Sequence, residues 1–284
     1  MLSKILVPVR GDGLVETVLG HAAALARRHH AHVVVAHCRT RAEDLMPYGV
    51  PLPAFARKTM LTQAQELADQ QERELREELH SLAEKLQLNE TPASPENKTT
   101  VEFVEESGRM ADVIKHNGRL ADLIVVAKPD RDRNVGTNSL KSGLFQTGRP
   151  VLMCPTGKHV PDAFGERIAV AWNGSLEASR TVALTLDLVG AAGSVVILAG
   201  GKGEPHGATA EELVDYYKLR GISAEIHRFE AESPGAALLR KAHETRAGLL
   251  VMGAYSTSHE RETLLGGNTQ AVVDAADIPV VLAH

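Results

Sequence analysis

The chain has 284 residues and a formal net charge of −5, with 43% hydrophobic and 24% charged residues. This balance excludes a disordered chain, and the lack of a concentrated basic stretch argues against nucleic-acid binding. No apolar run approaches the ~20 residues that span a bilayer, and Ile5–Val7 is too short for a signal peptide, so we expect a cytoplasmic protein without membrane contact. Cys38 and Cys154 lie in apolar runs and are expected to be buried free thiols.

In chain order, the first segment is Lys4–Asp12, which reads as a basic residue, an apolar strand and a polar turn with glycine. A helix from Leu14 to Arg28 follows, with apolar residues at helical spacing. A second apolar run follows at Val33–His37. His29 and His30 end the helix, while His32 and His37 lie at an odd spacing on or beside the strand. This arrangement does not predict a metal site, and a cation at the helix C-terminus is the simpler interpretation.

The next segment is an insertion around Arg41–Leu88. The interval from Lys4 to Ala121 is 117 residues, against 80 from Arg167 to Ala247, so the first part of the chain is longer by about 37 residues. The insertion contains a proline-rich loop, Pro47–Pro53, and a charged helix from about Thr62 to Leu86. An amphipathic helix that covers the sheet is one interpretation, and a lid or partner-docking element is the other.

The pattern then repeats along the chain. A helix at Ala111–Leu120 and apolar runs at 121–127 and 149–154 complete the first half. The second half has matching helices at Leu176–Leu188 and Pro234–Thr245. Its matching apolar runs are 167–172, 195–199, 247–253 and 278–283. We therefore predict a domain at residues 1–157, a linker at 158–165 and a second domain at 166–284.

The fold class follows from this order. The strands are continuous apolar runs, as expected for parallel strands covered on both faces. Each half alternates strand and helix, so the sequence predicts an α/β protein of two tandem Rossmann-like domains. Each domain would be a doubly wound, five-stranded parallel sheet with helices on both faces. Ligands of such sheets bind beyond the carboxyl ends of the strands, at the point where the strand order reverses.

Two segments of the second half meet at that point. Trp172 and Asn173 end the first strand, and Gly253 ends the fourth. A loop with Ser256 and His259 follows, and a helix begins near Gly266, Gly267, Asn268 and Thr269. Glycines allow backbone N–H groups to approach an anion, and a helix N-terminus favours negative charge. The pattern is typical of a phosphate-binding site.

These residues resemble the universal stress protein family. The family motif is Gly-x2-Gly-x9-Gly-Ser/Thr, and this chain has Gly253-x2-Ser256-x9-Gly266-Gly267. The spacing is kept, but Ser256 replaces a glycine and Gly267 replaces the hydroxyl residue. Asn268 and Thr269 offer side-chain donors nearby. Asn173 stands where the family has an aspartate beside the base and ribose.

The resemblance implies a stress-response protein that binds ATP or a related adenine nucleotide in its second domain, with magnesium only as carried by the nucleotide. It also implies an internal pseudo-dimer through the last strands, and a homodimer stays open. No catalytic residues are predicted, and at most weak ATP hydrolysis. The alternative is a stress protein that binds no nucleotide and acts through a partner or small ligand.

The first half departs further from the family motif. Ala127 to Pro150 is 23 residues, against 26 from Gly253 to Pro279, so its loop is shorter. Pro129 removes an N–H donor, and Asp130 and Asp132 would repel phosphate. We expect the first half to be a partner domain with a degenerate site.

Overall fold

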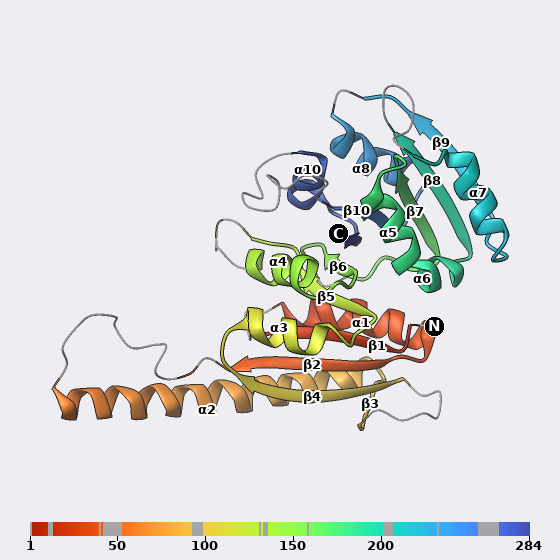
Figure 1. The fold of residues 1–284 in the computed structure, drawn as a ribbon. Helices are drawn as coiled ribbons and strands as arrows, with labels where there is room; N and C mark the ends of the chain where they lie inside the picture. Colours follow the sequence, from red (N-terminus) through yellow and green to blue (C-terminus); the bar gives the residue numbers. More distant parts are fainter. Residues whose placement is uncertain are drawn as a thin grey trace.

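The computed structural model describes residues 2–10, 14–39, 41, 53–92, 99–130, 132, 136–157, 159–200, 207–231, 233–254 and 267–284. Strands and helices alternate in both halves of the chain (Figure 1). The strands of the first half are β1 Lys4–Val9, β2 His32–Arg39, β3 Asn89–Glu90, β4 Thr100–Ser107, β5 Leu123–Ala127 and β6 Val151–Cys154. Those of the second half are β7 Arg167–Trp172, β8 Ser194–Gly200, β9 Ala224–Phe229, β10 Leu249–Gly253 and β11 Val280–Ala283.

The helices connect successive strands. The first half has α1 Val15–His29, α2 Ala54–Lys85, α3 Met110–Gly118 and α4 Thr137–Gln146. The second half has α5 Leu176–Leu184, α6 Leu186–Gly190, α7 Ala210–Lys218, α8 Pro234–Glu244 and α10 Gly267–Ala275. The predicted α/β class with a repeated strand–helix order is therefore confirmed.

All strands belong to one eleven-stranded sheet with the order β3-β4-β2-β1-β5-β6-β11-β10-β7-β8-β9. Within each half the main strands are parallel, and the chain order reverses between β1 and β5 and between β7 and β10. The halves join where β6 and β11 pair antiparallel, with Leu152 opposite Val281. Each doubly wound unit thus shields the open edge of the other.

Helices cover both faces of this sheet. One buried cluster contains residues from α1, α2, α5, α6 and α7, and the other contains residues from α3, α4, α8 and α10. The inner strands, such as β2, β5 and β10, are almost wholly buried, which explains their continuous apolar sequences. Both clusters include residues of both halves, so the core continues across the β6–β11 seam.

Two helices differ from their predicted bounds. The helix expected from Thr62 begins at Ala54, directly after Pro53, whose extended backbone starts it. The helix expected over 176–188 is divided between α5 and α6 at Thr185. Thr181 and Thr185 donate hydroxyl hydrogen bonds to Glu177 O and Thr181 O, at 2.7 Å each, a pattern that bends helices.

Within the described ranges, no helix is long and apolar enough to cross a membrane. Cys38 and Cys154 are buried free thiols, as expected.

Candidate functional site

The candidate site lies at the carboxyl ends of β7 and β10. These strands pair parallel, with Val251 opposite Val170. The next strand of the sheet is β8 on the side of β7 and β11 on the side of β10, so the strand order reverses between β7 and β10. The helices that follow β7, β9 and β10 are α5, α8 and α10, so their N-termini lie at this same end. Because helix N-termini carry unpaired N–H groups and a positive dipole, the arrangement favours an anion.

The turn after β7 depends on close backbone packing. Gly174 has a φ of 74°, and a Cβ on it would lie 2.9 Å from the nitrogen of Gly207. The indole Nε1 of Trp172 donates to Ala208 O at 2.9 Å. Trp172 is 7% exposed, so this predicted ligand residue holds the 207–208 segment against the end of β7. Its described contact is therefore a packing contact beside the candidate site.

Asn173 is exposed and shapes the start of α5. Its Oδ1 accepts a hydrogen bond from Ser175 N at 3.1 Å, and Ser175 Oγ in turn accepts from Ala178 N at 3.2 Å. An amide oxygen that faces a backbone N–H leaves the NH₂ group directed elsewhere. Asn173 thus retains a donor at the end of β7.

Gly253 provides room for α5. A Cβ on this residue would lie 2.8 Å from Ala178 N and 2.8 Å from the carbonyl carbon of Glu177. Any larger residue would push the first turn of α5 away from β10. The glycine that the motif predicts near a phosphate therefore also has a packing role at the strand end.

The start of α10 joins the start of α8. Gly267 has a φ of 79°, a conformation that favours glycine, and Asn268 Oδ1 accepts from Gly235 N at 3.2 Å. Asn268 is exposed, whereas Thr269 is buried. The structure thus brings Asn268 to the paired N-termini of α8 and α10. The other predicted residues Ser256, His259 and Gly266 lie outside the described residues.

The equivalent end of the first half has a different geometry. Gly136, before α4, has a φ of 86°, and a Cβ on it would lie 3.1 Å from the Cα of Pro129. The turn therefore rests directly on the residues that follow β5. Sequence reasoning missed one signal here, because Gly136-Thr137-Asn138-Ser139 at the start of α4 matches Gly266-Gly267-Asn268-Thr269 at the start of α10.

A contact between the halves adjoins the candidate site. The terminal residue His284 forms a 2.9 Å hydrogen bond through Nδ1 to Ala254 O, directly after Gly253. Its ring meets Phe145 of α4 edge-on, with centroids 5.1 Å apart. His284 therefore links Ala254 to a helix of the first half.

Buried histidines of the first half contact neighbouring side chains. His32 Nδ1 lies 2.8 Å from Thr100 Oγ1, and the His37 ring stacks on Phe103. His29 is buried, and burial is the main cause that lowers its pKa, which disfavours the charged form that a helix-terminal cation requires. In the described part of the chain, no three His, Cys, Asp or Glu side chains gather as a metal site.

Two linked doubly wound units, with one candidate anion site at a strand-order reversal, define the class of protein. The model of the universal stress protein family matches residues 1–135 and 199–284, more than half of the chain. The chain belongs to the universal stress protein family, in its tandem form.

Solved structures support the fold. A universal stress protein from Archaeoglobus fulgidus has a TM-score of 0.71 at 17% identity, and covers 100% of this chain and 96% of its own. A universal stress protein from Pseudomonas aeruginosa has a TM-score of 0.58 at 17% identity, and covers 99% of this chain and 93% of its own. A search of curated proteins finds no match.

Proposed function

We propose that the second half binds ATP or a related adenine nucleotide, as a regulatory ligand in the cytoplasm. The observation that supports this most is the geometry of Asn268. Its amide oxygen accepts from Gly235 N, which turns the NH₂ group into the available donor at the N-terminus of α10. A donor beside the positive end of a helix suits a phosphate.

In this proposal the phosphates lie at the start of α10, near Gly266, Gly267, Asn268 and Thr269, with Ser256 and His259 in the preceding loop. Asn173 contacts the ribose, and the wall held by Trp172 and Ala208 lies beside the base. Magnesium would arrive with the nucleotide. Backbone N–H groups and amides hold phosphate without removing a proton from water, so binding rather than turnover is expected.

The first experiment measures what the purified chain carries. Mass spectrometry of the denatured protein should release an adenine nucleotide, and the stripped protein should gain thermal stability with Mg-ATP. No released nucleotide together with no shift at millimolar Mg-ATP would contradict the proposal.

A substitution can test the site with little change of fold. Asn268→Asp keeps an oxygen that accepts from Gly235 N but replaces the NH₂ donor with a negative charge. The affinity for ATP should fall by about tenfold or more, since like charges repel at a site of this kind. Asn138→Asp makes the same change at the matching position of α4 and serves as the control. Equal effects of the two substitutions would contradict a site confined to the second half.

A further inference from the structure

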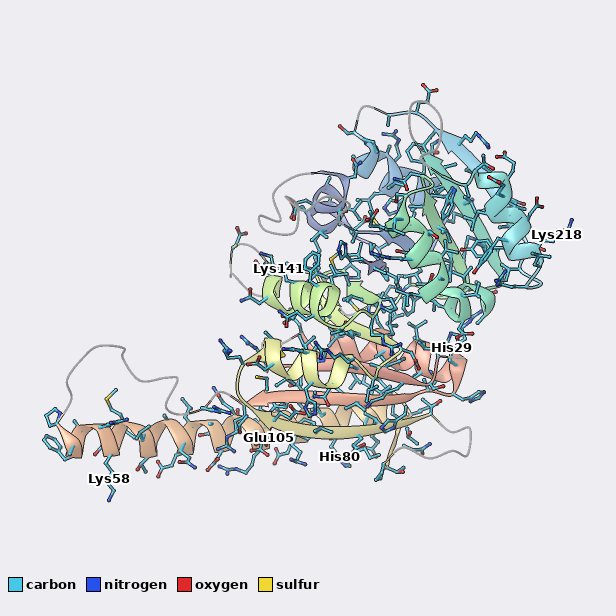
Figure 2. The ribbon with its side chains drawn as sticks, viewed as in Figure 1. His29, Lys58, His80, Glu105, Lys141 and Lys218 are labelled. Atoms are coloured by element: carbon cyan, nitrogen blue, oxygen red, sulfur yellow. The ribbon has the colours of Figure 1, made fainter. Side chains whose placement is uncertain are left out.

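Helix α2 consists of two parts with different surroundings. It has 32 residues, about 48 Å of helix, and its buried residues are Leu75, Leu79, Leu82 and Ala83. In Figure 1 the C-terminal part lies along β4, while the N-terminal part extends well beyond the ends of the strands. Figure 2 shows Lys58 far out on the extended part, and Glu105 and His80 at the sheet.

The anchor of α2 begins about halfway along the helix. Arg39, at the end of β2, pairs with Asp69 and, at 3.0 Å, with Glu72. The Arg76 guanidinium lies 4.6 Å from the centroid of the Phe103 ring. Residues 54–68 precede all of these contacts and include no buried side chain. We call residues 54–68 the projecting segment.

The projecting segment has an apolar face. Met60, Leu61, Ala64, Leu67 and Ala68 follow the spacing of an amphipathic helix. This face is continuous with the buried one, because Leu61, Ala68, Leu75 and Leu82 are each seven residues apart. Met60 is 37% exposed and Leu67 is 55% exposed. The projecting segment alone is short enough to be a marginal helix in water without packing, so its apolar face favours contact with a partner.

We infer that the projecting segment pairs antiparallel with that of a second copy of this chain, with Ala64 at the twofold axis. In this register Leu61 faces Leu67 of the other copy, Met60 faces Ala68, and Ala64 faces Ala64. The face is therefore complementary to itself, as a twofold interface requires. The small Ala64 side chain lets the two helices approach closely at the centre.

The charges of α2 favour the antiparallel direction. Arg57 and Lys58 lie near its start, whereas Glu66 and Glu74 lie further along, beside Asp69 and Glu72, which already pair with Arg39. An antiparallel pair places the basic end of each helix against the acidic part of the other, and a parallel pair would place like charges together. The sheets of the two copies then lie at opposite ends of the helix pair, because each projecting segment extends away from the sheet of its own chain.

Sedimentation velocity of the full chain over a range of concentrations tests this dimer. We expect a monomer–dimer equilibrium whose dissociation constant rises at least tenfold in Leu67→Glu. Phe55→Glu is the matched control, since Phe55 is 75% exposed but lies outside the apolar face of the same helix. A monomer at all concentrations, or equal effects of the two substitutions, would overturn the inference. Circular dichroism checks that both variants fold.

A crosslink fixes the register independently. In Ala64→Cys the two introduced thiols meet at the axis, so mild oxidation should yield a disulfide-linked dimer; the native Cys38 and Cys154 are buried and contribute little background. Thr59→Cys, off the apolar face, should crosslink far less. Equal crosslinking at both positions would overturn the antiparallel register.

Discussion

The two halves share one topology but differ at the residue that precedes β5 and β10. In the first half this residue is Asp122, whose carboxylate accepts hydrogen bonds from Ser3 N at 2.7 Å and Lys4 N at 2.9 Å. In the second half it is Gly248, and the backbone of Ala163 passes so close that a Cβ would lie 2.2 Å from its carbonyl carbon. A side chain holds the segment that enters β1, whereas the segment that enters β7 needs room to pass.

The opposite ends of the same strands also differ. Ala127 ends β5 with a Cβ in place, and the turn before α4 packs on Pro129. Gly253 ends β10 without a Cβ, and α5 fills the space. In the first half the turn before α4 packs on the residues after β5, and in the second half the start of α5 packs on the end of β10.

The largest effect should come from Gly248→Ala. The added Cβ overlaps the backbone of Ala163 and Phe164, which cannot move without shifting the linker, so we expect a loss of about 3 kcal/mol or more in the free energy of unfolding. Urea denaturation measures it. Asp122→Ala in the first half should cost less, since it removes two hydrogen bonds without a clash. An unchanged free energy of unfolding in Gly248→Ala would contradict the close passage of the linker over Gly248.

Gly253→Ala should have the next largest effect. Its Cβ would press on the first turn of α5 at 2.8 Å, and the expected cost is about 1–3 kcal/mol, together with weaker ATP binding if the nucleotide lies there. The reverse change in the first half, Ala127→Gly, should cost less than about 1 kcal/mol. If Ala is tolerated at 253 as well as at 127, the strand ends are equivalent after all.

The sequence predicts those parts of the fold whose signal is local. Four strands of each half are evident because they are buried on both faces. Strands β4 and β9 escape the same reasoning, because Glu102, Glu105, Glu225 and Arg228 interrupt their apolar pattern where the sheet meets solvent. The early start of α2 is not predicted either, since its first residues, 54–60, are exposed or half-buried and give no apolar pattern.

The sequence predicts the candidate site from spacing, but not the contacts around it. The family motif points to Gly253, Ser256, Gly266 and Gly267, because spacing between glycines survives in the sequence, and Asn268 follows as a nearby donor. The bond from Trp172 to Ala208 joins residues 36 apart, and that from Lys128 to Ala276 joins residues 148 apart. Side chains that meet across such distances leave no local pattern, so only the structure reveals them.

Mild acid should weaken the first half more than the second. Burial is the main cause that lowers the pKa of His21, His29, His32 and His37, all in the first half. As pH falls past 6.5, the unfolded chain binds protons at these rings while the folded chain resists them, so stability falls. A step from pH 7.5 to 6.5 should have a small effect, because unfolded imidazoles are then only half protonated.

Hydrogen exchange, corrected for its intrinsic pH dependence, measures this loss separately in β1–β2 and β7–β8. His37→Phe keeps a ring on Phe103 and removes one titrating group, so it should reduce the loss. An equal loss in both halves would show that the four rings do not set the pH dependence.

Lys128→Met should have the smallest effect and tests whether the first half supports the second. Lys128 Nζ donates to Ala276 O at 2.8 Å, just past the C-terminus of α10, where a positive charge is favourable. Burial lowers the pKa of Lys128, while the charges of Asp274 and Asp277 act in the opposite direction. The cost of desolvating the ammonium group therefore offsets part of the stability that the hydrogen bond contributes. We expect a cost of about 1 kcal/mol, seen as faster hydrogen exchange in α10. Lys141→Met, on α4, is the control, and equal exchange in the two variants would mean that the first half does not hold α10 in place.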